Sequence, residues 1–338
     1  MEAERVVRRR RPEPTGGRSA NRSRSAPRSR SGAGRDRTEG AKGRTAPKGA
    51  KGRTAPKGAK GRTAPKGAKS SRAGRSEQAP AAAGSLSSHL IRPAADGHKV
   101  KIGIVWFLTA LGALLVGRWA ITILWTAVAV VAAWQVAGAW ARYSPDSPAP
   151  AFTPALAAVA TAALVASSGV GTALAGVALI VVPLAVIGVV MGSGRKPAAA
   201  GAALIAVVIS SVPAISVVLV ARAETWAALF LVAAVSFYDA GYFIGAAESS
   251  SRLEGPVTGG IGLLAVTFTA SAFEAAPFDR ASAWIAGVLM LVACPLGQML
   301  TSAELPEPAA AAPAMRRLDS YLVAAPLMLV AVWSLGSV

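Results

Sequence analysis

The sequence predicts an all-α polytopic membrane protein, in which a bundle of about nine transmembrane helices follows a disordered N-terminal tail. From residue 101 to residue 338 the chain is mostly Ala, Val, Leu, Ile and Gly, and several stretches of about 20 residues contain no charge. An α-helix needs this length to cross the hydrocarbon core of a bilayer. A soluble domain could bury one or two helices that are apolar all round, but a long succession of them would leave no polar face for water.

The first 100 residues have a different character and carry nearly all of the excess positive charge. Residues 1–102 contain 27 Lys and Arg against 7 Asp and Glu, a net charge of +20. Residues 41–67 repeat the nonapeptide Ala-Lys-Gly-Arg-Thr-Ala-Pro-Lys-Gly three times. Every copy contains Gly and Pro and offers little apolar surface, so burial cannot offset the entropy cost of ordering. We therefore expect residues 1–100 to be disordered.

This polybasic tail has three candidate roles. It could lie on anionic lipid headgroups, with each Lys or Arg near the surface contributing roughly 1 kcal/mol. It could bind nucleic acid by counterion release, or it could serve as a solvated spacer. The first 100 positions contain no aromatic residue, which disfavours nucleic acid because base stacking uses aromatic rings. Contact with lipid headgroups or other anions is the favoured interpretation.

Apolar runs bounded by Gly, Pro and charged residues predict the positions of the membrane-spanning helices. Two junctions, at Gly117 and at residues 169–171, are short for a turn between two helices that both cross a membrane, so a total of seven or eight spans stays open. The nine expected spans are residues 102–117, 119–141, 153–169, 172–193, 198–221, 224–247, 257–276, 283–300 and 319–337.

The distribution of Lys and Arg between the loops predicts the orientation, because short cytoplasmic loops are enriched in these residues. With the N-terminus inside, six basic residues fall on the cytoplasmic side and three on the opposite side. The sequence therefore predicts an integral protein of the cell membrane with a cytoplasmic N-terminus. The six are Arg142, Arg195, Lys196, Arg252, Arg316 and Arg317, and the three are Arg118, Arg222 and Arg280.

Ionisable residues are scarce after the tail, and Asp239 is the one placed most deeply in an expected span. An isolated carboxylate in hydrocarbon costs several kcal/mol, so it must face water, a cation or a partner. One interpretation is structural, with Asp239 paired to Arg252 or Arg317 to lock the bundle. The other is functional, with Asp239 contributing to a site at the membrane face.

A second group of polar residues, Ser302, Arg316, Arg317, Asp319 and Ser320, is expected at the same cytoplasmic face. The arginines could be positive-inside anchors, and the last two residues could cap the final helix. Together with Asp239, however, these residues bring two carboxylates and two guanidiniums to one face. A divalent cation on the carboxylates and guanidiniums on phosphate oxygens suit phosphoryl or nucleotidyl transfer. A shared cation requires the carboxylates to lie within about 8 Å of each other.

Other enzyme classes find little support in the sequence. Both histidines, His89 and His98, precede the first expected span, which excludes a membrane-embedded zinc site or histidine base. No serine lies in a nucleophile elbow and no Gly-rich loop carries the Lys of a P-loop. Cys294 stands alone in an apolar run, and we interpret it as a small packed hydrophobic residue.

Residues 236–326 carry four short motifs whose order resembles the phosphatidate cytidylyltransferase family, also called CDP-diacylglycerol synthase. The motifs are an Asp-x-Gly-x-Tyr-x-x-Gly-like segment, a Gly-Gly turn, a Gly-Asp-Leu-x-x-Ser-like segment, and a Leu-Asp-Arg-x-Asp-Ser-like segment followed by Ala-Ala-Pro. The matching residues are Asp239, Gly241, Tyr242 and Gly245; Gly259 and Gly260; Gly297 and Ser302; and Arg317, Asp319, Ser320, Ala324, Ala325 and Pro326.

The resemblance implies an Mg²⁺-dependent enzyme of phospholipid synthesis that joins CTP to phosphatidate and releases pyrophosphate. It implies Asp319 and Asp239 as catalytic and metal-binding residues. It implies that a second set of residues, at the same face, binds substrate. The implied partners are the membrane, phosphatidate and CTP, whereas a homodimer is an arrangement that the sequence leaves open. The substrate-binding set is Arg317, Arg316, Ser302, Ser320 and Tyr242.

The sequence also departs from the family pattern. Gln298 stands where the family has an Asp, and Arg316 replaces the first Asp of the paired-aspartate motif. Several Lys and Arg residues of the family have no counterpart here, and residues 303–308 take the place of some of them. The runner-up hypothesis is therefore a non-catalytic relative that binds anionic lipid or recruits a partner. A transporter that uses Asp239 as an ion site is a third, less favoured hypothesis, since matching broken helices in two halves are not seen.

Overall fold

The computed structural model describes residues 97–143, 153–247, 251, 253–274, 277–308 and 310–335. All α-helices and the single short 3₁₀ helix in these ranges belong to one helical unit, and the ranges contain no strand. This confirms the predicted all-α fold class. The tail prediction and the repeats at 41–67 fall on residues outside the described part of the chain.

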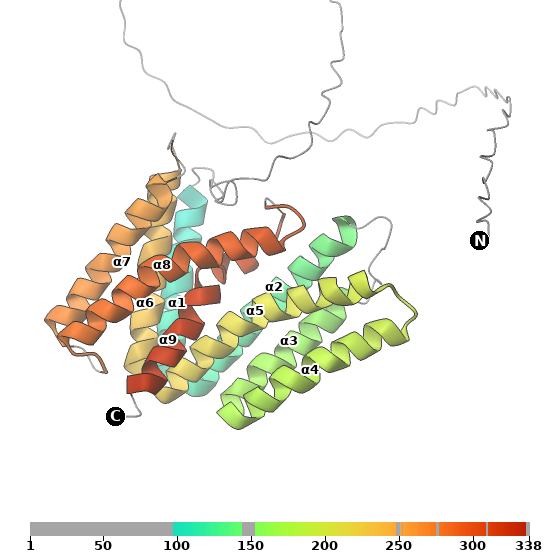
Figure 1. Cartoon of the computed structure of the whole chain (residues 1–338). Coiled ribbons are helices and arrows are strands. Elements are labelled where there is room, and N and C mark those ends of the chain that lie inside the picture. Colours follow the sequence, from blue (N-terminus) through green and yellow to red (C-terminus); the bar gives the residue numbers. More distant parts are fainter. Residues whose placement is uncertain are drawn as a thin grey trace, which may run out of the picture. The chain divides into compact units, whose positions relative to one another are not determined.

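Nine α-helices lie in the described ranges, one for each expected span, and most of their ends fall within three residues of the expected ones (Figure 1). Seven of them are long and apolar enough to cross a membrane, and α1 and α9 contain shorter apolar segments, Lys101–Val116 and Tyr321–Ser334. The helices are α1 (Gly97–Val116), α2 (Arg118–Tyr143), α3 (Thr153–Val170), α4 (Thr172–Gly192), α5 (Pro197–Ala223), α6 (Thr225–Ala246), α7 (Glu254–Ala272), α8 (Arg280–Glu304) and α9 (Tyr321–Leu335), with the 3₁₀ helix η2 (Met315–Arg317) before α9.

The two short junctions are real helix breaks. Gly117 separates α1 from α2, and Gly171 separates α3 from α4, so that a single residue lies between the helices of each pair. Gly117 has a φ of 117°, a backbone conformation that residues with a side chain rarely adopt. The helices on either side of each break pack against each other. A one-residue junction therefore suffices to reverse the chain, and nine separate helices result.

Helix α5 lies at the centre of the packing. It contacts α2, α3, α4, α6 and α9, and most of its apolar side chains are buried. By contrast, α4 packs only against α3 and α5 among the principal contacts, and most of its side chains are exposed. Exposed Leu, Ile and Val side chains are what a helix at the lipid boundary of a membrane protein should present. The uniform apolarity of α4 therefore reflects a lipid-facing position rather than burial in protein.

Glycines bring α6 and α7 into close contact (Figure 1). A Cβ atom added at Gly241 would lie 2.4 Å from the carbonyl oxygen of Thr258, and one added at Gly259 would lie 2.9 Å from the Tyr238 carbonyl oxygen. These distances leave no room for any side chain. Gly241 and Gly259 thus allow the two helices to pack closely. This packing fixes the C-terminal half of α6, which carries the deepest carboxylate.

A similar close approach sets the start of α9 against α8. A Cβ atom added at Gly297 would lie 2.2 Å from the carbonyl oxygen of Asp319. The last turns of α8, the last turns of α6 and the segment that precedes α9 consequently meet at one end of the bundle. The polar residues that the sequence singled out lie at this meeting point.

Candidate functional site

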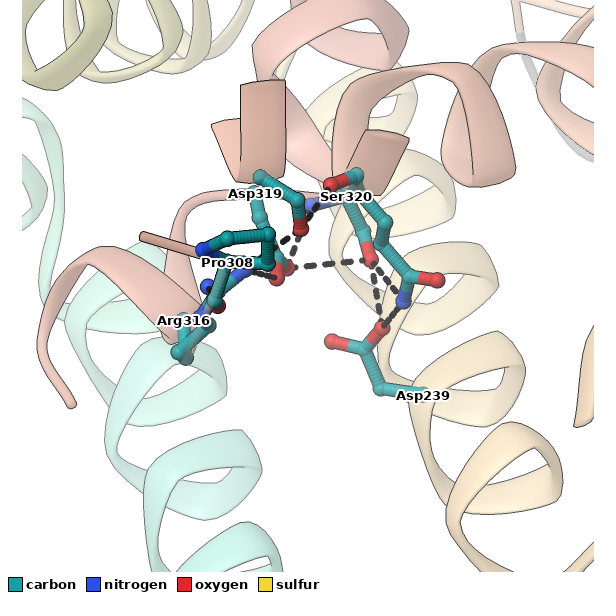
Figure 2. Close-up of polar contacts among 7 residues, drawn as sticks. Asp239, Pro308, Arg316, Asp319 and Ser320 are labelled. Carbon is teal, nitrogen blue, oxygen red and sulfur yellow. Dashed lines mark hydrogen bonds and ion pairs between the residues drawn. The ribbon is translucent and has the colours of Figure 1, made fainter. Parts of the chain in front are cut away.

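The Asp239 carboxylate projects from α6 toward the start of α9 (Figure 2). Its Oδ1 atom accepts a hydrogen bond of 2.6 Å from the Ser320 hydroxyl. The side-chain amide nitrogen of Gln298, on α8, lies 3.5 Å from the same oxygen. Asp239 is therefore held by neutral donors from two other segments, rather than by an arginine. An ion pair between Asp239 and Arg317, which the sequence left open, is therefore not what holds Asp239.

Asp319 lies on the other side of the same hydroxyl. It is buried, with 7% of its surface exposed, and its Oδ1 accepts a 2.7 Å hydrogen bond from the backbone N–H of Ser320. The Ser320 hydroxyl lies 3.5 Å from this Oδ1 and 2.6 Å from Asp239 Oδ1. The separation of the two carboxylate oxygens cannot exceed the sum of these distances. It is therefore below about 8 Å, the separation beyond which the sequence-based hypothesis of a shared cation would fail.

Gln298 is the member of the site whose role the sequence did not predict. Its amide nitrogen donates a 3.0 Å hydrogen bond to the Ser320 hydroxyl and also faces Asp239. Its carbonyl oxygen, Oε1, is buried and has no hydrogen-bond partner among the described residues. A buried acceptor without a partner costs free energy and is the kind of group that a cation or a donor would satisfy. The sequence feature that could have identified this role is the position of Gln298, a polar residue directly after Gly297 in an otherwise apolar part of α8.

Arg316 is held by the chain itself. Its Nη1 donates a 3.0 Å hydrogen bond to the Ser302 hydroxyl and lies 3.8 Å from Asp319 Oδ2, and its Nη2 donates to the carbonyl oxygen of Pro308 (Figure 2). Burial lowers the pKa of the Arg316 guanidinium, and the negative charge of Asp319 opposes that shift. Arg316 therefore fixes Asp319 and the loop after α8, which is more than a positive-inside anchor does.

Arg317 is the less constrained of the two arginines. Its Nη1 lies beside α1, where a Cβ atom added at Gly103 would be 3.8 Å away. Among the described residues the Arg317 side chain makes neither an ion pair nor a side-chain hydrogen bond, yet it is close enough to act electrostatically on Asp239 and Asp319. A guanidinium in this position is available to an anion that approaches the carboxylates.

Tyr242 lies at the edge of the site on α6. Its ring packs against α7, since a Cβ atom added at Gly255 would lie 2.9 Å from Tyr242 Cε2, and its centroid is 6.2 Å from that of Tyr238. Tyr242 also interacts electrostatically with Arg316 and Asp319. The tyrosine therefore borders the charged cluster.

The structure thus brings the candidate residues to one end of the bundle. The carboxylates, the two serines and Arg316 form one connected set, and Arg317 and Tyr242 flank it. Arg252, the other proposed partner of Asp239, lies outside the described residues. The helix-cap interpretation of Asp319 and Ser320 is not what the hydrogen bonds show, because Asp319 Oδ1 accepts from the adjacent N–H and the Ser320 hydroxyl bonds to the carboxylate on α6.

The side chains at this site suit Mg²⁺, which keeps water and phosphate ligands, better than a metal that needs three or more protein ligands. In the described part of the chain no three His, Cys, Asp or Glu side chains lie together as a metal site. The oxygen donors that lie together are two carboxylates and the Ser320 hydroxyl. Mg²⁺ commonly takes one or two carboxylates and completes its shell with water and substrate phosphates. Asp239 and Asp319 are the side chains that would hold such an ion.

Comparisons with known proteins add no relative. No protein-family model matches the chain, and searches of curated proteins and of solved structures found no significant match. The likeness to a known family therefore depends on the order of the motifs and on the residues of this site.

Proposed function

We propose that this chain is a membrane-embedded, Mg²⁺-dependent nucleotidyltransferase of the phosphatidate cytidylyltransferase type, which joins CTP to phosphatidate at the cytoplasmic face. The observation that carries the proposal is the pair of carboxylates, Asp239 and Asp319, that flank one hydroxyl next to two arginines. In a chain with few ionisable groups after its tail, this concentration of charge at the end of a helix bundle is costly. A site for charged substrates accounts for it.

In this reaction an oxygen of the lipid phosphate attacks the α-phosphorus of CTP. The bond between the α-phosphorus and the oxygen that bridges to the β-phosphorus breaks, and pyrophosphate leaves. A bound Mg²⁺ would neutralise phosphate oxygens and favour an in-line arrangement. No proton has to be removed from a phosphate that is already ionised, so the site needs no dedicated base.

The residues of this chain then have distinct tasks. Arg317, which has no ion pair among the described residues, contacts a substrate phosphate, and a guanidinium suits this because its N–H groups match phosphate oxygens. Arg316 holds Asp319 and the loop at Pro308 in place. The hydroxyls of Ser302 and Ser320 and the ring of Tyr242 border the space that the substrates occupy. Asp239 and Asp319 hold the cation.

A second candidate function is supported by one specific observation, the amide of Gln298. Where the family has an Asp, this side chain donates to Ser320 and faces Asp239 with its N–H group. A donor at this point satisfies the carboxylate without a metal. The alternative is therefore a non-catalytic relative that binds phosphatidate or another anionic phospholipid through Arg317.

The test is an activity assay on the full chain in lipid nanodiscs with CTP, phosphatidate and Mg²⁺, in which CDP-diacylglycerol is measured by mass spectrometry. The proposal predicts product from the wild type, loss of product in Asp319→Asn and Asp239→Asn, and full activity in Asp279→Asn. The last variant is a matched control because Asp279 lies in a different part of the described chain, at the exposed start of α8. A wild type that forms no more product than Asp319→Asn refutes the enzyme.

The alternative function is measured on the same preparations. Native mass spectrometry would show whether phosphatidate is retained in preference to phosphatidylcholine. Preferential retention that Arg317→Ala abolishes, without any product in the activity assay, supports the non-catalytic lipid-binding protein. Equal retention of both lipids excludes that alternative as well.

A further inference from the structure

The last turns of α2 contact the segment that joins α8 to η2. Nε1 of Trp140 donates a 3.2 Å hydrogen bond to the carbonyl oxygen of Glu304, the last residue of α8. Oε1 of Gln135 accepts a 2.9 Å hydrogen bond from the backbone N–H of Ala314, the residue directly before η2. Helix α2 therefore holds this segment at both of its ends.

Gln135 is an unusual residue for its place in the chain. It is the only amide side chain in α2, and its neighbours in the sequence are apolar. A polar side chain in a transmembrane helix commonly bonds to a partner on another segment. Here the partner is a backbone N–H that lies 179 residues away in the sequence. An N–H group at the start of a helix has no acceptor within that helix, and the Gln135 amide supplies one to Ala314.

The residue that Gln135 holds is the one from which η2 starts. The carbonyl oxygen of Ala314 accepts a 3.0 Å hydrogen bond from the backbone N–H of Arg317, which closes the turn of η2. A second contact on η2 comes from α5. Met315 is buried, and the Ser210 hydroxyl of α5 lies 3.8 Å from its sulfur atom. The 3₁₀ helix is therefore fixed by α2 and by α5.

Charged residues of the candidate site belong to this turn or follow it closely. Arg317 is the last residue of η2, and Asp319 comes two positions later. We propose that Gln135 is a positioning residue of this site, which acts through the backbone of Ala314. By holding η2 in place, it sets the position of Arg317 and Asp319 relative to Asp239. This inference rests on the proposed function, because it concerns the same carboxylates, and it adds α2 to the helices that build the site.

Two substitutions of similar size separate the hydrogen bond of Gln135 from the packing of its side chain. Gln135→Met removes the acceptor, whereas Gln135→Glu keeps an oxygen at the same position. The first measurement is hydrogen exchange of residues 312–320 in the full chain in lipid nanodiscs, read by mass spectrometry. Gln135→Met should raise the exchange rate roughly tenfold, and Gln135→Glu should exchange as the wild type does. The matched control is Ser211→Ala, which removes a buried hydroxyl that bonds to the Val207 carbonyl oxygen of its own helix and should leave the rate unchanged.

A second measurement distinguishes positioning of Asp319 from a merely structural role. The Tm is measured without divalent cation for Gln135→Met, for Asp319→Asn and for the double variant. If Gln135 positions Asp319, the fall in Tm caused by Gln135→Met should be about half as large or smaller in the Asp319→Asn background, because the interactions of the carboxylate are already weakened there. A merely structural role gives equal falls in both backgrounds.

Mn²⁺ titration then connects the inference to the cation site. Gln135→Met should weaken Mn²⁺ binding several-fold, and Gln135→Glu should restore it. The inference is overturned if Gln135→Met leaves the exchange of residues 312–320 unchanged, if Gln135→Glu exchanges as fast as Gln135→Met, if the falls in Tm are equal, or if Gln135→Met binds Mn²⁺ as tightly as a wild type that binds it. A wild type that binds no Mn²⁺ refutes the proposed function instead, and the exchange rates and the Tm values still decide the role of Gln135.

Discussion

Gly297 is the position at which a single methyl group should dismantle the site. In Gly297→Ala the new Cβ atom would lie 2.2 Å from the carbonyl oxygen of Asp319, well inside van der Waals contact. The obstacle is backbone, so no side chain can rotate away. Either α8 or the segment before α9 must move, and the hydroxyl of Ser320 is attached to that segment. Its bonds to Gln298 and Asp239, at 3.0 and 2.6 Å, should then lengthen or break.

The cost of this change can be estimated from its parts. Overpacking of a close contact costs typically about 1–3 kcal/mol, and each lost hydrogen bond adds about 0.5–1.5 kcal/mol. Against this, Ala is favoured over Gly in a helix by up to about 1 kcal/mol. We expect a net loss of roughly 2–4 kcal/mol in the free energy of unfolding, which for a chain of this size corresponds to a fall in Tm of at least ~5 °C.

The assay is thermal unfolding in detergent or nanodiscs, followed by intrinsic tryptophan fluorescence. Gly201→Ala provides the matched control, because Gly201 also lies in a helix but has no atom within 4 Å of the added Cβ. The control should be neutral or slightly stabilised. If Gly297→Ala unfolds at the same temperature as the control, the close approach of α8 to the start of α9 is wrong, and with it the geometry of the site.

Three further predictions concern individual charges. Gln298→Asp places a third carboxylate beside Asp239, so it should lower Tm without a divalent cation and raise Mn²⁺ affinity by roughly tenfold, as measured by titration. Arg316→Gln leaves Asp319 buried without its cation and should destabilise the chain by about 1–3 kcal/mol, measured as a fall in Tm that Mg²⁺ partly restores. Hydrogen bonds from the first turn of α8 hold the pKa of Asp279 below its usual value, so its contribution is present above the unfolded pKa and lost as pH falls through the folded one. The difference in Tm between wild type and Asp279→Asn at neutral pH should therefore begin to shrink as pH falls below roughly 4 and vanish only below the lowered folded pKa.

Asp279 caps the start of α8 through reciprocal hydrogen bonds with Ser282. Asp279 Oδ1 accepts from the backbone N–H of Ser282 at 2.7 Å, and the Ser282 hydroxyl accepts from the Asp279 N–H at 2.9 Å, which is a capping box. If the Tm difference were independent of pH, the carboxylate charge would contribute nothing to this cap. For the other two variants, unchanged Mn²⁺ binding in Gln298→Asp or an unchanged Tm in Arg316→Gln would count against the site geometry.

The fold was predictable from the sequence because each helix is specified locally. Apolar runs of the required length bounded by Gly, Pro or charge were sufficient to place α3 and α4, including the break at Gly171. Helix α8 begins at Arg280, after the capping residue Asp279. The apolar pattern predicted a start at residue 283, three residues too late. Polar caps extend a helix beyond its apolar run, and this explains the difference.

The site was predictable in its membership but not in its contacts. Asp239 and Asp319 stood out because charges are rare in this part of the chain, and that argument needs no knowledge of packing. Gln298 stood out only as a departure from the family pattern, and its contacts could not be predicted, because a polar side chain in a helix gains its meaning from the neighbours that packing supplies. For Gln298 those neighbours are Ser320 and Asp239, which lie 22 and 59 residues away in the sequence.

The shared use of a cation by the two carboxylates is the central claim, and Mn²⁺ binding tests it most directly. Mn²⁺ can be followed by electron paramagnetic resonance in the full chain, with Mg²⁺ as competitor. We predict one saturable site per chain that Mg²⁺ displaces, that Asp239→Asn and Asp319→Asn each abolish, and that Asp279→Asn retains. If either of the first two variants binds Mn²⁺ as the wild type does, the carboxylates do not form one site and the account is wrong.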